Sequence, residues 1–212
     1  MSPAGTFERV YIALKQQLMA GSFRPGDRLE PALLGQELSS SITPVRDALH
    51  RLVGERLVAA PRHDGFQVPL LTETALRDLY SWNDQLLALA TRTPKRRDAH
   101  ALFRSPSAAD PKGPPADVEA ATGDLFLRIA HLSASAEHVA AVASANDRLH
   151  AVRVAEGWLL EHREIEVGRI QSHLDSRDLA NLRSELAAYH RRRKKLADRI
   201  ILALEQGGPF IP

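Results

Sequence analysis

The 212-residue chain contains no cysteine, which excludes disulfide bonds, thiolate metal sites and a cysteine nucleophile. It also lacks any run of roughly 18 apolar residues, and its N-terminus has no signal-peptide hydrophobic core. We therefore expect a cytoplasmic protein that does not associate with a membrane. A strong charge of one sign is missing too, because 28 Lys and Arg face 26 Asp and Glu. Any binding of DNA must then come from local patches.

The common signatures of enzymes are absent as well. No glycine-rich phosphate loop, nucleophile elbow or HExxH zinc helix occurs in the sequence. Carboxylates are plentiful, but they fall on the outer faces of amphipathic segments and form no paired constellation. We therefore expect a protein that is not an enzyme and needs no cofactor. Its length allows one large domain or two small ones, and its 44% hydrophobic content is ample for packed cores.

Residues 41–52 have the pattern of a short helix with a fixed start. Thr43 can accept hydrogen bonds from the free N–H groups of a helix start, and Pro44 then takes the first helical position. Arg46 and His50 lie outside the apolar stripe that recurs at helical spacing, which is Val45, Ala48, Leu49 and Leu52. A helix with an apolar back and a basic front suits the major groove of DNA.

The flanks favour a winged helix-turn-helix over a bare amphipathic helix. Upstream, a first helix ends near Gly21, a second begins at Pro31, and residues 39–41 form the turn before the third. Downstream, residues 57–68 are predicted to form a β-hairpin, with strands at both ends and turn residues between them. Three helices followed by a hairpin make a winged helix-turn-helix.

Three motifs in this region resemble the GntR family of bacterial transcription regulators: Gly21-Ser-Phe-Arg-Pro25-Gly26-Asp27-Arg-Leu29, Thr43-Pro44-Val45-Arg46-Asp47-Ala48-Leu49 and Gly65-Phe66-Gln67-Val68. The subgroup suggested is the one with an all-helical FCD ligand-binding domain. The resemblance implies a mainly α chain, with a winged helix-turn-helix DNA-binding domain at residues 1–70 and a helical effector-binding and dimerisation domain at residues 71–212. It further implies a homodimeric repressor that binds a pseudo-palindromic operator in double-stranded DNA and responds to a small-molecule effector.

Candidate DNA contacts lie on the third helix and on the hairpin. The family usually has a DNA-contacting arginine at the positions of Ile42 and Ala32, so both departures remove charge. Residues 1–70 hold only eight Lys and Arg against seven Asp and Glu, so we expect specific, dimer-assisted binding. The contacts are predicted to rest on Ser41, Thr43, Pro44, Arg46, His50, Arg62, His63 and Gly65.

Three of these residues have alternative interpretations. Arg46 could instead be a solvated arginine paired with a carboxylate. Arg62 and His63 could enter the minor groove from the hairpin tip, or belong to an exposed loop without contacts. Gly65 is predicted to be needed for the backbone freedom of a tight turn.

The rest of the chain keeps helical spacing and has no credible strand, which predicts a helical bundle. A hinge is expected at residues 69–72, and a loop at the proline-rich residues 104–117. Helices are predicted at residues 72–93, 118–132, 139–153, 165–174 and 178–200.

Many FCD domains bind a divalent metal through an Asp and three His. At the corresponding positions this chain has residues that do not ligate, or ligate poorly, which are Gly123, Leu127, Val167 and Tyr189. Such a site needs three or four converging donors, so we expect it to be lost. The alternative uses Asp124, His131 and His190, and it would require a shifted alignment.

Five polar residues lie on otherwise apolar helical stripes and are candidates for effector binding: Asn83, Asn146, Arg153, Tyr189 and Arg193. Polar groups that converge in a bundle interior often meet a ligand. The family usually has Arg at the position of Asn83 and Glu at that of Leu87, so we expect a less charged pocket and a more apolar effector. The alternative is that the five bond one another in a filled core. The helical domain would then be an effector-independent dimerisation or partner-docking module.

Overall fold

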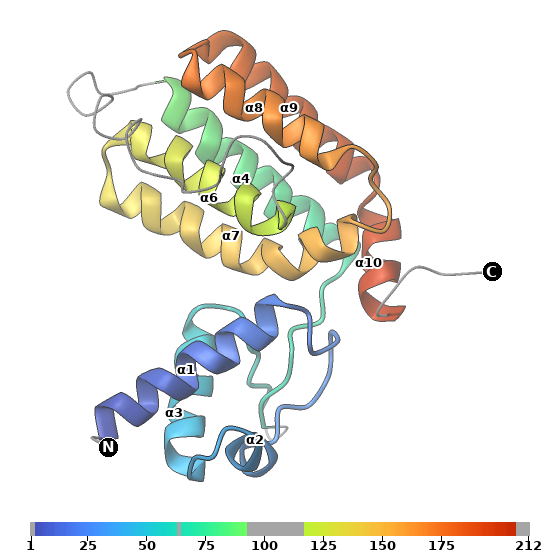
Figure 1. Ribbon diagram of the computed structural model, residues 1–212. Helices are drawn as coiled ribbons and strands as arrows, with labels where there is room; N and C mark the ends of the chain where they lie inside the picture. The colour runs from blue at the N-terminus through green and yellow to red at the C-terminus, as the bar shows by residue number, and fades with distance from the viewer. Residues whose placement is uncertain (1–2, 63–64, 93–116, 207–212) are drawn as a thin grey trace. The chain divides into compact units, whose positions relative to one another are not determined.

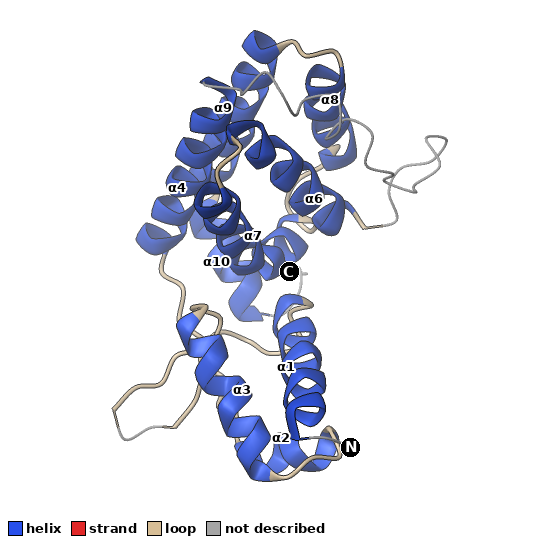
Figure 2. Cartoon of the chain, turned by 90° about the vertical axis from the view of Figure 1, so that its left-hand side faces the viewer, coloured by secondary structure: helices blue, strands red, loops and turns tan. Residues whose placement is uncertain are grey.

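The computed structural model describes residues 3–62, 65–92 and 117–206 of the chain. Within these ranges the regular secondary structure is helical, apart from two isolated antiparallel bridges (Figure 1; Figure 2). The mainly α fold that the sequence predicts is therefore confirmed. The chain divides into two compact units, Met1–Leu71 together with Leu202–Pro212, and Thr72–Ile201. None of the described helices is both long and apolar enough to cross a membrane.

The N-terminal unit contains the three expected helices, α1 (Pro3–Met19), α2 (Pro31–Glu37) and α3 (Ile42–Gly54). Pro31 occupies the start of α2, where its missing N–H leaves no intrahelical bond unmade. Gly21 follows α1 with φ of +73°, a conformation that favours glycine. The helices enclose one apolar core, in which the most deeply buried side chains are Val10, Leu14, Leu29, Val45, Ala48, Leu49 and Leu52.

The start of α3 lies earlier than expected. Ser41 is the N-cap, with an extended backbone (φ −75°, ψ 164°), and Ile42 is the first helical residue. Thr43 and Pro44 are therefore the second and third residues of the helix, so the prediction that Thr43 is the cap is wrong. Pro44 is tolerated there because the first four N–H groups of a helix have no intrahelical partner. Ile42 therefore belongs to α3.

The expected hairpin is present without regular strands. Ala59 and Gln67 exchange two backbone hydrogen bonds of 2.8 and 2.9 Å, and Gln67 also forms a bridge with Arg28. The prediction of strands at both ends of residues 57–68 is therefore wrong. The pairing stays short because Pro61 and Pro69 lie on either side of it, and proline cannot donate to a ladder.

The second unit is a helical bundle. Its elements are α4 (Glu73–Arg92), α6 (Val118–Ala130), the short 3₁₀ helix η1 (His131–Ser133), α7 (Ala136–Glu156), α8 (Arg163–Asp175) and α9 (Leu179–Lys195), after which α10 (Ala197–Gln206) follows. Helix α4 packs against α7 and α9, and α6 packs against α7 and α8. Three helices begin at side-chain caps, which are Asp117, Ser135 and Asp178.

The end of the second unit differs from the sequence prediction. The single last helix predicted at residues 178–200 is wrong, because the chain leaves helical geometry at Leu196 (φ −104°, ψ 12°) and α10 begins after it. Leucine has good helix propensity, so the sequence carries no signal for this break. The loop expected at residues 104–117 lies outside the described residues except for Asp117.

Candidate functional site

Helix α3 exposes a polar face opposite the apolar stripe that it buries. Val45, Ala48, Leu49 and Leu52 are fully buried, whereas Thr43, Arg46 and His50 are exposed and lie one or two helical turns apart. Ser41 is also exposed, and Pro44 is half-buried. The structure thus brings three of the predicted DNA-binding residues, Thr43, Arg46 and His50, together along one face of α3.

Two arginines of α3 have different surroundings. Arg51 lies with its guanidinium carbon 3.8 Å from the centroid of the Tyr11 ring, and it pairs with Glu8 and Glu55 at 3.4 Å. Arg51 therefore joins α3 to α1. Within the described part of the chain, Arg46 has no ion pair or hydrogen bond, which makes it the more available of the two for a partner outside the protein.

The hairpin lies beside the end of this face. The His50 ring meets the Phe66 ring edge to face, with centroids 4.9 Å apart. Arg62 is exposed, and Gly65 has φ of +73°, in agreement with the backbone freedom expected of it. His63 lies outside the described residues, so its expected contact with DNA stays a prediction.

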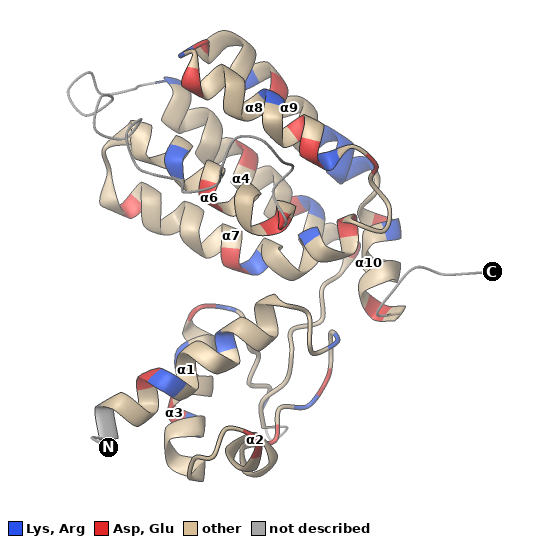
Figure 3. Ribbon diagram, viewed as in Figure 1, with Lys and Arg blue, Asp and Glu red and all other residues tan. Residues whose placement is uncertain are grey.

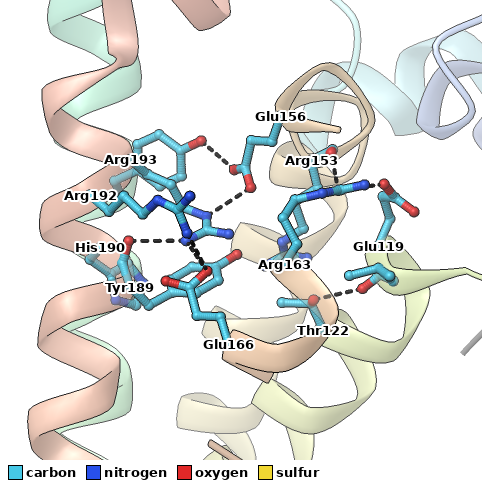
Figure 4. A network of polar contacts seen from close by, with 12 residues as sticks. Glu119, Thr122, Arg153, Glu156, Arg163, Glu166, Tyr189, His190, Arg192 and Arg193 are labelled. Atoms are coloured by element: carbon cyan, nitrogen blue, oxygen red, sulfur yellow. Dashed lines mark hydrogen bonds and ion pairs between the residues drawn. The ribbon is translucent and has the colours of Figure 1, made fainter. Parts of the chain in front are cut away.

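Arg193 is the centre of a buried charge network in the second unit (Figure 4). Its side chain donates to Glu156 at 2.7 Å and to Glu166 at 2.9 Å, and the two carboxylates approach the guanidinium from different helices. Tyr80 completes the network by donating to the other oxygen of Glu156 at 2.5 Å. Desolvation opposes the charge of Arg193, but the two carboxylates outweigh it and raise the pKa of the guanidinium.

Arg153 is equally buried but poorly paired. Its Nη2 donates to Asn146 at 2.8 Å, and Asn146 donates in turn to the backbone oxygen of Gly123. The guanidinium carbon lies 5.2 Å from the centroid of the Phe126 ring. The side chain is 2% exposed, and within the described residues its Nε and Nη1 atoms make no hydrogen bond. The buried cation thus has only neutral neighbours, the Asn146 amide and the Tyr189 side chain, an arrangement that is costly unless something else binds it.

A third polar group joins α4 to α9. The Nε2 atom of His190 lies 2.9 Å from the side-chain oxygen of Asn83, and its Nδ1 atom lies 2.7 Å from the backbone oxygen of Leu186. Burial lowers the pKa of His190 to about 3, because it disfavours the charged ring. A neutral ring that donates from Nδ1 to Leu186 must accept at Nε2, so the amide of Asn83 fits best when its nitrogen faces the ring.

The five predicted effector residues therefore do not form one cluster of direct bonds. Asn146 and Arg153 pair with each other, Asn83 pairs with His190, and Arg193 donates to the Tyr189 backbone oxygen at 3.2 Å. Sequence reasoning missed the partners that bury these groups, which are Tyr80, Glu156, Glu166 and His190. The two glutamates have the spacing of ordinary surface residues, so only the positions of the neighbouring helices distinguish them.

The positions that correspond to family metal ligands hold no donor cluster. Within residues 3–62, 65–92 and 117–206, no three His, Asp or Glu side chains gather in a way that could hold a metal ion. A shifted set is also not assembled, because Asp124 and His131 are exposed whereas His190 is fully buried against Leu186 and Asn83. An ideal Cβ atom at Gly123 would lie 3.7 Å from Nη1 of Arg153. The loss of an ancestral metal site stays a prediction.

Comparison with known proteins bears on both units. Residues 6–68 match the family model "Bacterial regulatory proteins, gntR family". These residues are thus similar to the helix-turn-helix domain of that family. Over 70 residues the chain is 34% identical to the Escherichia coli K12 "HTH-type transcriptional repressor GlaR", a match over 33% of this chain and 32% of that protein. Over 66 residues it is 39% identical to the "HTH-type transcriptional regulator McbR" of the same organism, over 31% and 30%. The chain thus spans about a third of the length of these curated relatives. The family and the relatives are transcriptional regulators rather than enzymes.

Solved structures extend the likeness of fold beyond the gntR domain. The structure described as "E. coli McbR/YncC" has a TM-score of 0.62 at 21% identity, covering 92% of this chain and 97% of that one. A putative GntR regulator from Rhodococcus sp. RHA1 has a TM-score of 0.67 at 20% identity, covering 90% and 96%. At these identities the comparison shows the fold alone, including the helical second unit.

Proposed function

We propose that this chain is a transcriptional repressor that binds a pseudo-palindromic operator as a homodimer. The observation that carries the proposal is the exposed face of α3 inside a matched gntR domain, where Arg46 has no partner within the described residues. In a helix-turn-helix the first residues of the second helix meet base edges, and neighbouring cations meet phosphates. The face offers few cations, so binding depends on two half-sites.

A selection of bound fragments from the source genome tests this function. The recovered sequence is then measured by fluorescence anisotropy at two salt concentrations against a shuffled duplex of equal length. We expect an inverted repeat that binds well above the shuffled duplex. Weak binding without a consensus would contradict the proposal and favour a protein-interaction module.

We further propose that the second unit binds a small-molecule effector at Arg153. The sequence favoured a rather apolar effector, but two unpartnered nitrogens on a buried guanidinium favour a ligand with an anionic group. Phe126 supplies an apolar wall at the same place. Asn146 would fix the orientation of Arg153, because it already accepts from Nη2. The site would thus combine one charge with an apolar surface.

Thermal-shift measurements with matched anionic and neutral compounds test the effector proposal. We expect stabilisation by a subset of carboxylates or phosphates, and its loss in an Arg153→Met variant. The matched control is Arg191→Met, because Arg191 is exposed on α9. If no compound class shifts the melting temperature, the alternative of an effector-independent module gains support, as the complete pairing of Arg193 already suggests for that part of the core.

A further inference from the structure

The first residue of α3 is a large apolar side chain that the fold leaves in solvent. Ile42 is 45% exposed. The core of the unit does not need it, because Val45, Leu49 and Leu52 on the opposite side of α3 are fully buried without its help. Its neighbours Ser41 and Thr43 are exposed and polar. Ile42 is thus an isolated apolar group on a polar face, in contrast to the continuous stripe behind it.

The position of Ile42 limits what it can contact on DNA. Arg46 follows it by four residues and therefore lies on the same side of α3. A face that is docked through Arg46 brings the first turn of the helix towards base edges, as in other helix-turn-helix proteins. An isoleucine can neither pair with a phosphate nor bond a base edge. The major groove presents one apolar group that it can cover, the C5-methyl group of thymine.

We propose that Ile42 is a specificity-determining residue that reads a thymine methyl group in each half-site of the operator. The proposal rests on the proposed DNA binding and adds the chemistry that the α3 face recognises. Its contribution comes from burying a methyl group, so it amounts to about fourfold in affinity per half-site, or about 15-fold for a symmetric site. No counterion is released by such a contact, so the preference should not depend on salt concentration.

Replacing thymine by deoxyuridine tests this inference, because the change removes the methyl group and leaves every hydrogen bond intact. Each thymine of the selected operator is replaced in turn, symmetrically in both half-sites, and affinity is measured by anisotropy. For the unaltered protein we expect one position at which affinity falls by about 15-fold. The Ile42→Ala variant should bind the normal operator more weakly and show no further loss at that position.

A control variant makes the assignment specific. Leu33 is 58% exposed on α2, and in a helix-turn-helix the first helix crosses the DNA backbone, so Leu33→Ala should keep the full discrimination between thymine and deoxyuridine. Thermal melting of each variant checks that folding is unchanged, as expected for exposed positions.

Three results would overturn the inference, and they can be told apart. No effect of deoxyuridine at any position means that no methyl group is read, although operator binding stands. An equal loss in the unaltered protein and in Ile42→Ala means that another side chain reads it. The absence of any selected operator overturns the proposed function itself, and the role of Ile42 with it.

Discussion

The start of α3 and the interior of the second unit reverse the usual places of apolar and charged side chains. Helix α3, which we propose to face DNA, begins with an exposed isoleucine, whereas the helical bundle buries two arginines and two glutamates almost completely. Figure 3 shows basic residues gathered at the end of α9, and two residues of its last turn, Arg192 and Lys195, are exposed in the ordinary way. A buried charge is unfavourable unless it is paired, so each buried charged side chain marks a place where a partner or a specific pairing offsets it.

The two buried arginines, Arg153 and Arg193, are not equivalent, although both are almost completely buried. Arg193 is neutralised by two carboxylates of the protein itself, so its role is to hold α7, α8 and α9 together. Arg153 has only neutral partners, Asn146 and Tyr189, and its Nε and Nη1 atoms make no hydrogen bond to a described residue. The pairing of Arg193 is complete within the protein, whereas the incomplete pairing of Arg153 is what supports the effector proposal.

The largest expected effect on stability follows from removing Arg193, the cation of the network with Glu156 and Glu166. Arg193→Met should lower the free energy of unfolding by about 3–5 kcal/mol, because Glu156 is left buried without its counter-charge and Glu166 keeps only the exposed Arg192 at 3.9 Å. Denaturant titration measures this loss. Adding Glu156→Gln and Glu166→Gln to the same variant should restore much of it. A loss below about 0.5 kcal/mol, the range of an exposed substitution, would show that the carboxylates are not truly buried.

The pH dependence of stability offers the next effect. An unfolded histidine titrates near 6.5, and burial lowers the pKa of His190 to about 3, so acid protonates the unfolded chain first. This contribution to stability is full above pH 6.5 and is lost as the pH falls towards the folded value. Between pH 7 and pH 5 the loss should be about 2 kcal/mol. Denaturant titrations at the two pH values measure it.

A His190→Gln variant isolates this contribution from that of His150, whose pKa burial also lowers. The variant should lose less stability than the unaltered protein between the same two pH values. An identical pH dependence in both proteins would mean that His190 is not held neutral by burial.

The smallest effect on stability is expected from removing Arg153, whose side chain is incompletely paired. Arg153→Met should change the free energy of unfolding by no more than about 1 kcal/mol, because the lost hydrogen bond to Asn146 is offset by relief of a buried charge. The same denaturant titration, run beside Arg193→Met, compares two equally buried arginines directly. A loss as large as that of Arg193→Met would show that Arg153 is a structural cation and would remove the support for an effector there.

The sequence specified much of the fold and less of the site. Helical periodicity, Pro31 and the turn residues located the N-terminal helices, and the apolar stripes located those of the bundle. The break at Leu196 and the N-cap at Ser41 were missed, because local propensity does not distinguish them from their neighbours. Asn146 and Arg153 were both predicted to face the interior, since polar residues on apolar stripes are conspicuous.

Their partners were not predictable in the same way. Glu156 and Glu166 belong to helices whose other faces are rich in charge, and a glutamate turned inwards has the same sequence pattern as one turned outwards. Asn146 and Arg153 lie two turns apart on the same helix, α7, so helical spacing predicts only their own contact, and the surroundings of Arg153 depend on the neighbouring helices. The expected apolar effector therefore did not take the unsatisfied guanidinium into account, and it stays a prediction.

The most direct test of the account compares operator and shuffled DNA for the unaltered protein and for Arg46→Ala. Arg46 is the exposed cation of α3 that no described residue pairs, so its removal should weaken operator binding by about 1–3 kcal/mol per half-site and leave the melting temperature unchanged. The ratio of operator affinity to shuffled affinity should therefore fall at least about tenfold. An unchanged ratio in a folded Arg46→Ala protein would show that the face of α3 does not read DNA.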